Sequence, residues 1–104
     1  MRLKYGSRRT WSQFWNCWFA SKAEAKRADE LWLLQMAGEI SDLQRQVKFV
    51  LSEKPRVSIT IDFEYMDNGQ KVFEDVKGVL TRDFRTKMAW LKEKYNIDVR
   101  LMEV

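Results

Sequence analysis

A chain of 104 residues is long enough for one domain with a modest hydrophobic core, and its formal net charge of +4 favours acidic partners. It has no histidine and a single cysteine, Cys17, which excludes hydrolases with a histidine base, histidine metal sites, an intrachain disulfide and a structural zinc site. The 4 glycines form no nucleotide-cradling loop. Because there is also no apolar signal core and no membrane-spanning apolar run, we expect a cytoplasmic protein.

The positive charge is concentrated near the N-terminus. Residues 1–27 carry seven basic side chains against Glu24 alone, a net +6, whereas residues 28–104 carry twelve basic and fourteen acidic side chains, a net −2. The first of these stretches also holds six of the fourteen aromatic residues. Such a mixture suits nucleic acid, because cations contact phosphates and rings stack on bases. Alternatively, the aromatic side chains form core or a dimer interface and the charges only solvate the segment.

The first expected elements are an arm and a helix. Residues 1–13 show no hydrophobic periodicity and predict a basic, aromatic N-terminal arm of a single domain over 1–104. Residues 14–19 are compatible with a short strand or part of a hairpin. Ser21, followed three residues later by an acid, is a capping-box pattern, and a glycine follows the last helical position, so we predict a helix over 22–37.

Strands dominate the middle of the chain. Loose alternation predicts a strand over 43–51, and strong apolar–polar alternation predicts another over 57–65. An Asp-Asn-Gly turn then leads into a returning strand, 70–77. An apolar stripe predicts a second helix over 81–95, and 97–104 closes the chain as a strand. The order α-β-β-β-α-β predicts an α/β (α+β) fold in which helices flank a mixed central sheet.

Four charged residues on these elements fit a divalent-metal site. Asp62 lies on the polar face of its strand, and Asp75 and Lys77 lie two apart on the next strand, where alternation places both on one side. Glu74 points the other way, and Glu24 lies on the helix face directed toward the sheet. Hard cations bind carboxylate oxygens, and phosphodiester hydrolysis needs a metal-bound water with a cation nearby.

Each of these residues also has a simpler explanation. Asp62 can be solvated, although aspartate is unfavourable inside a strand. Asp75 and Lys77 can form a surface ion pair worth about 0–1 kcal/mol, and we expect both to be exposed enough to be replaced without leaving a cavity. Glu24 at the third helical position can stabilise the helix start without any chemistry.

Several blocks of sequence occur in an order that resembles a known family. They are Ser21-Lys22-Ala23-Glu24-Ala25-Lys26-Arg27, Ala37-Gly38-Glu39-Ile40, Leu43-Gln44-Arg45-Gln46, Asp62-Phe63-Glu64-Tyr65 and Glu74-Asp75-Val76-Lys77-Gly78. Together they resemble a small phage-encoded, resolvase-like family of unknown function within the PD-(D/E)XK nuclease superfamily. Ile61 precedes Asp62 where the superfamily motif has proline, and Val47 also stands where the family tends to have proline.

The resemblance implies a restriction-endonuclease-like core and a catalytic set. Asp62 and Asp75 would hold one or two Mg²⁺ (or Mn²⁺) ions with the backbone carbonyl of Val76, and Glu24 would complete a second position directly or through water. Lys77 would orient the attacking water and stabilise transition-state charge. Residues on flanking elements could hold DNA phosphates, or they could be solvated surface. These candidates are Arg8, Arg9, Lys22, Gln46, Thr81, Arg82, Arg85 and Lys87.

Three functional hypotheses follow. The leading one is a phage-encoded, metal-dependent DNA endonuclease in a bacterial host, selective for branched or duplex DNA such as a Holliday junction. It would act as a homodimer, with phage or host recombination proteins as further partners. The alternative is a catalytically inactive DNA- or protein-binding phage factor on the same fold. A third is a structural or regulatory protein that uses its tryptophan-rich arm as an interface. The sequence leaves DNA versus RNA, substrate geometry and the number of metals open.

Overall fold

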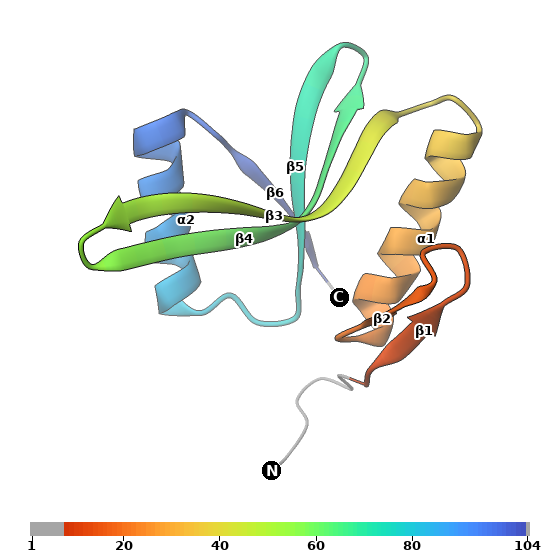
Figure 1. The fold of residues 1–104 in the computed structure, drawn as a ribbon, viewed down its shortest axis with the longest axis horizontal. Coiled ribbons are helices and arrows are strands. Elements are labelled where there is room, and N and C mark those ends of the chain that lie inside the picture. Colours follow the sequence, from red (N-terminus) through yellow and green to blue (C-terminus); the bar gives the residue numbers. More distant parts are fainter. Residues whose placement is uncertain (1–7, 104) are drawn as a thin grey trace.

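The computed structural model describes residues 8–103 as two helices and six strands (Figure 1). In chain order the elements are β1 (Thr10–Ser12), β2 (Cys17–Phe19), α1 (Lys22–Met36), β3 (Ser41–Glu53), β4 (Arg56–Asp67), β5 (Gln70–Lys77), α2 (Arg82–Tyr95) and β6 (Val99–Glu103). This mixed α+β architecture confirms the fold class expected from the sequence. None of the helices in 8–103 has the length and apolar character needed to cross a membrane.

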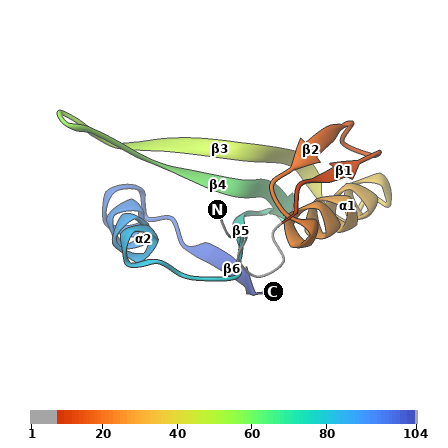
Figure 2. The same ribbon diagram turned by 90° about the horizontal axis from the view of Figure 1, so that it is seen from below.

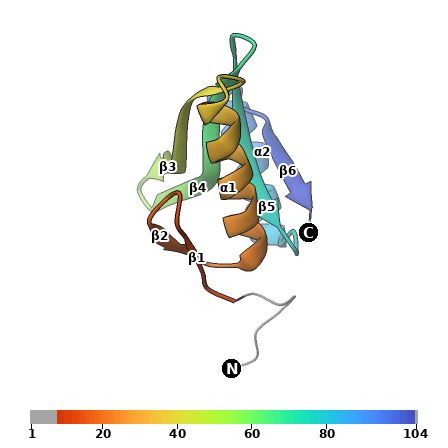
Figure 3. The same cartoon turned by 90° about the vertical axis from the view of Figure 1, so that its right-hand side faces the viewer.

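The main sheet has the strand order β3-β4-β5-β6. The first three strands are antiparallel neighbours, as expected for chain segments joined by tight turns, whereas β6 pairs parallel to β5 after the α2 crossover. β1 and β2 form a separate antiparallel hairpin. The two helices lie on opposite sides of β5 and β6, with the hairpin beside α1 (Figures 1 and 3).

β4 and β5 pair along only part of their lengths. Their backbone pairing runs from Asp67 opposite Gln70 to Phe63 opposite Glu74 and then stops. Beyond that point β4 continues with β3 alone as a two-stranded arm, while β5 continues with β6. Figure 2 shows this arm extending over α2. We call the place where the two strands separate the β4–β5 fork.

Apolar side chains form one core on each side of the fork. Under α1, the buried residues include Leu31, Phe63 and Tyr65. Under α2, they include Ile61 and Leu91. Burial of these apolar faces is the main force that holds both helices against the sheet, and the fork lies where the two cores meet.

Most boundaries follow the local signals, with a few differences. Ser21 caps α1 as predicted, and Thr81 caps α2, which begins one residue later than predicted; each side-chain oxygen accepts a backbone N–H three residues on. The predicted arm is wrong for 10–12, which pair with β2; residues 1–7 of the arm lie outside the described range. β3 is longer than the predicted strand 43–51. β6 begins at Val99 instead of the predicted residue 97, and residue 104 lies outside the described range.

Candidate metal and nucleic-acid site

Asp62 and Asp75 are the first residues past the end of β4–β5 backbone pairing. The backbone N–H of Asp62 donates to Asp75 Oδ1 at 2.8 Å, and the N–H of Val76 donates to Asp62 Oδ2 at 2.9 Å. Each carboxylate thus satisfies a backbone donor of the opposite strand that the ladder leaves unpaired. The fork therefore requires acceptors at these two positions, and aspartate supplies them together with negative charge.

Asp75 is buried, contrary to the exposure expected from the sequence. Its relative exposure is 1%, because it lies at the fork beneath the packed elements. Its Oδ2 is 3.0 Å from Lys77 Nζ, an ion-pair distance, but neither that ammonium nor any other group within 8–103 forms a hydrogen bond of good geometry with this oxygen. A buried carboxylate oxygen without a hydrogen bond is costly. The surface ion pair considered from the sequence therefore does not describe Asp75, which is buried.

Lys77 is held from two directions. Its ammonium lies 4.0 Å from the centroid of the Phe84 ring, on the first turn of α2, as well as beside Asp75. The side chain retains 30% exposure, so the cation faces both the buried carboxylate and solvent. This placement fixes a positive charge at the mouth of the fork.

Glu24 belongs to the same electrostatic group. Its carboxylate is 4.0 Å from the Arg45 guanidinium and is 13% exposed. Only half of the capping-box expectation is observed: the Glu24 N–H donates to Ser21 Oγ, while the carboxylate lies near Arg45. The acid is thus directed toward the sheet, as its helical position predicts.

The pKa shifts show that these groups interact. Burial, reinforced by the Asp75 carboxylate, raises the pKa of Asp62 to about 7, although the hydrogen bond from Val76 N–H opposes the rise. Burial also raises the pKa of Glu24, against the effect of Arg45, and Asp75 adds to the rise. Lys77 lowers the pKa of both acids. Burial is thus the main cause of both rises, the neighbouring carboxylate of Asp75 adds to them, and the nearby cations oppose them.

The donor chemistry at the fork fits a hard divalent cation. Asp62 and Asp75 supply adjacent carboxylates, and among the described residues the buried Asp75 Oδ2 has the Lys77 ion pair but no hydrogen bond of good geometry. No three acidic, histidine or cysteine side chains in 8–103 are grouped closely enough to enclose an ion by themselves. Mg²⁺ commonly binds through one or two carboxylates and keeps several waters, so the two aspartates suffice. Glu24 is close enough to influence the site electrostatically.

The predicted DNA contacts fall into two groups. Thr81, Arg82 and Arg85 are exposed at the start of α2, next to the site because Phe84 of the same turn contacts Lys77. Lys22, the first residue of α1, is also exposed.

Gln46, Arg8 and Arg9 lie elsewhere. Gln46 is exposed on β3, between residues paired with Phe63 and Ile61 and so opposite Asp62, and its φ of 56° is a left-handed conformation unusual within a strand. Strained backbone of this kind clusters at functional sites. Arg8 and Arg9 precede the β1–β2 hairpin and are exposed. The last predicted contact, Lys87, is half-buried on α2 and pairs with Asp83 at 3.3 Å.

Sequence reasoning missed a buried network behind the site. Glu74, fully buried, accepts hydrogen bonds from Arg27 Nε at 2.6 Å and Nη2 at 3.0 Å, and also from the Tyr65 hydroxyl. The hydrogen bond to Glu74 is the first cause of the raised pKa of Arg27, and burial followed by this bond raises the pKa of Tyr65 to about 12. Alternation along β5 indicated only that Glu74 points away from Asp75. Nothing in the sequence indicated its partners.

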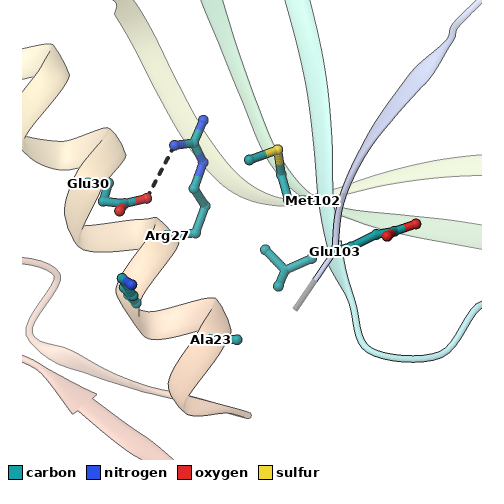
Figure 4. A pocket seen from close by; sticks show the side chains of 7 residues that line it. Ala23, Arg27, Glu30, Met102 and Glu103 are labelled. Atoms are coloured by element: carbon teal, nitrogen blue, oxygen red, sulfur yellow. Dashed lines mark hydrogen bonds and ion pairs between the residues drawn. The ribbon is translucent and has the colours of Figure 1, made fainter.

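A cavity of about 290 Å³ lies between α1 and β6, apart from the fork (Figure 4). Its lining is formed by Ala23, Lys26, Arg27, Glu30, Val76, Met102 and Glu103. Val76 is the one lining residue that also belongs to the candidate site, through its N–H bond to Asp62. The cavity is therefore not where the carboxylates meet.

Comparison with known proteins assigns a family but no activity. No curated protein matches the sequence. A family described as "Protein of unknown function (DUF1064)" matches residues 2–104, nearly the whole chain. The protein therefore belongs to the DUF1064 family.

Proposed function

We propose that the protein is a metal-dependent DNA endonuclease that hydrolyses phosphodiester bonds at the β4–β5 fork. One observation carries the proposal: a buried Asp75, whose Oδ2 contacts the Lys77 ammonium at 3.0 Å without a hydrogen bond of good geometry, meets the half-buried Asp62 at the point where two strands separate. Structural ion pairs do not require this arrangement, because their carboxylate oxygens are normally satisfied. The resemblance of the acidic blocks to PD-(D/E)XK nucleases supports the same reaction.

The residues of the fork have separate tasks in this proposal. A bound Mg²⁺ or Mn²⁺ would lower the pKa of a water and offset phosphate charge. Asp62 and Asp75 would hold the cation, with the Val76 carbonyl as a further ligand, and Glu24 would hold a water or a second ion. Lys77, kept in place by Asp75 and Phe84, orients the attacking water and stabilises charge that develops on the phosphate oxygens.

The substrate is inferred from the surroundings of the fork. Exposed Arg82 and Arg85 lie at the N-terminal turn of α2, where unpaired N–H groups and the helix dipole favour a phosphate. Lys22 occupies the same position on α1. We infer a branched or duplex DNA such as a four-way junction, cut by a homodimer because each chain has one such site.

A binding protein without catalysis is the second candidate. Two observations favour it: Lys77 already neutralises Asp75 at 3.0 Å, and no three-carboxylate group occurs among residues 8–103. In this case the fork would be a structural solution for separating two strands, and DNA binding would persist without cleavage.

Cleavage assays separate the two candidates. The protein is incubated with a four-way junction, a flap, plain duplex and single strands, each in Mg²⁺, Mn²⁺ or EDTA. We expect strand cleavage in either metal and none in EDTA, with Asp98→Asn, an exposed carboxylate paired with Lys92, as an active control. Binding without cleavage in every metal would favour the second candidate and contradict the endonuclease.

A further inference from the structure

The β1–β2 hairpin divides its aromatic side chains between the core and the surface. Trp15 is partly buried: its Nε1 donates to the Ala28 carbonyl at 2.8 Å, and its ring contacts Phe19 and Phe63. Trp11 and Trp18, in contrast, are 44% and 52% exposed. Packing in the core, one of the two interpretations of the aromatic segment, thus holds for Trp15 and not for Trp11 and Trp18. The exposed pair needs its own explanation, since large exposed apolar groups commonly mark binding surfaces.

Trp11 and Trp18 form a small, fixed surface. They are direct cross-strand partners, their ring centroids are 5.5 Å apart, and the Arg9 guanidinium lies 5.1 Å from the Trp18 ring. The hairpin is anchored to α1, because buried Ser12 donates to Asp29 Oδ1 at 2.6 Å. A surface held in this way loses little conformational freedom when it binds a ligand.

The charges around this surface indicate what it binds. Arg8 and Arg9 are exposed directly before the hairpin, and Lys22 and Lys26 are exposed on the first turns of α1. The nearby acids are already engaged, because Asp29 accepts from Ser12 and Glu24 is largely buried near Arg45. A polyanion with flat apolar groups matches this combination. A second copy of the chain matches it poorly, because a two-fold contact through Trp18 would bring the two Arg9 side chains together.

We propose that Trp11 and Trp18 form a stacking platform for unpaired bases of a DNA strand. Each exposed ring can stack on one base, and Arg9 can contact a neighbouring phosphate. The hairpin is linked to the candidate site through its buried side, because Arg45 lies 4.3 Å from the Phe19 ring of β2 and 4.0 Å from Glu24. The platform rests on the proposed function for the choice of DNA as its ligand. It also deepens that function, because unpaired bases would distinguish a branched DNA from plain duplex.

The test measures binding without cleavage. Fluorescence anisotropy in EDTA compares a labelled oligo(dT), its oligo(rU) equivalent and an abasic oligomer of equal length. We expect Trp18→Ala, and more strongly Trp11→Ala/Trp18→Ala, to weaken oligo(dT) binding about tenfold or more while changing abasic binding little. Trp18→Tyr should keep most of the affinity because a ring remains. Trp90→Ala, a 39% exposed tryptophan on α2, is the matched control.

Several results would overturn the platform. They are unchanged oligo(dT) binding by the double variant, equal losses for oligo(dT) and abasic DNA, or an equal loss in Trp90→Ala. Preference for oligo(rU) would overturn DNA as the ligand. If Trp11→Ala/Trp18→Ala converts a dimer into a monomer and leaves oligo(dT) binding unchanged, the two tryptophans contact a second copy of the chain instead of DNA. This test measures binding and not cleavage. If the two tryptophans bind bases but the protein cuts no DNA, the platform stands and only the proposed endonuclease activity is contradicted.

Discussion

At the scale of single residues, the fork depends on two aspartates that each have two tasks. Asp62 and Asp75 accept backbone N–H bonds across the gap between β4 and β5 and concentrate negative charge. The first task would also be done by the amide oxygen of asparagine, whereas binding of a divalent cation would lose the negative charge of the carboxylate. Conservative substitutions therefore separate structure from function here better than alanine does, particularly at buried Asp75.

We expect Asp75→Asn and Lys77→Ala each to reduce cleavage by at least about 100-fold, because each removes a ligand or a transition-state cation. Asp75→Asn should fold, since its amide oxygen can still accept the Asp62 N–H. Rates come from single-turnover cleavage, and circular dichroism checks the fold. Lys92→Ala, which also removes a lysine paired with an aspartate, is the control. Wild-type rates in both variants would remove these residues from catalysis.

The raised pKa of Asp62 predicts an unusual pH dependence of stability. Its pKa is about 7 in the folded protein and 3.8 as the reference value, so the folded state binds more protons between these pH values. The free energy of unfolding should therefore fall as pH rises from about 4 to 7. The Asp62→Asn variant has no carboxylate to ionise and should keep this stability. In EDTA at pH 8 its Tm should therefore exceed that of the wild type, with a free energy of unfolding larger by on the order of 2 kcal/mol.

Thermal unfolding between pH 5 and 8 measures this effect, with Asp98→Asn as an exposed control that should follow the wild type. Adding Mg²⁺ at pH 8 should raise the Tm of the wild type and not that of Asp62→Asn, since a ligand stabilises only the form that binds it. A Tm that falls in Asp62→Asn at pH 8 would show that the carboxylate stabilises the fork and contradict the argument.

Glu24→Gln tests whether this acid is a cap or part of the site. Glutamine also completes a capping box, so a purely structural residue should tolerate the change. We expect loss of cleavage with an unchanged or slightly higher Tm, because burial raises the pKa of Glu24 and the neutral side chain avoids that cost. Full activity in this variant would return Glu24 to a structural role.

At the scale of secondary structure, β5 is positioned by opposite contacts on its two faces. Glu74 faces α1 and is held by Arg27 and Tyr65, while its neighbour Asp75 faces the fork. Adjacent strand residues point to opposite faces, so fixing one fixes the other. The buried Arg27–Glu74 pair thus sets the orientation of β5 from the side away from the site.

Breaking this pair should destabilise the protein strongly. Arg27→Ala leaves Glu74 as a buried, unpaired charge, a change that costs about 3–5 kcal/mol. Adding Glu74→Gln should recover a substantial part, because the remaining side chain is neutral and can still accept from Tyr65. Urea denaturation of the single and double variants measures the coupling. Strictly additive losses would mean that the pair does not act as a unit.

At the scale of the whole molecule, the fold is flat, with extents of 42 × 39 × 21 Å, and residues 8–103 contain one fork. Two symmetric cuts in a junction would require two copies. We expect light scattering to give twice the chain mass of 12.5 kDa. Mixing wild-type protein with an excess of Asp75→Asn should then produce junctions cut on one strand, because mixed dimers have one active site. A monomer that makes paired cuts would contradict the dimer while leaving the endonuclease intact.

The sequence by itself determined both helices and the four strands of the main sheet, whereas β1 was not predicted. Capping at Ser21, the Asp-Asn-Gly turn and the alternation over 57–65 are local signals, and local physics sets helix ends and hairpins. The spacing of Asp75 and Lys77 also predicted that they share one face, and their 3.0 Å approach confirms it. These features depend on residues close together in the chain.

Tertiary structure alone decided the environment of those charges. Where β4 and β5 separate depends on α2 packing under the β3–β4 arm, which no local pattern contains. That separation buries Asp75, raises the pKa of Asp62 and places Gln46 opposite it. The same holds for Arg27 and Glu74, 47 residues apart. Burial and partners at these positions arise from long-range packing, and the chemistry of a carboxylate depends on them more than on its place in the sequence.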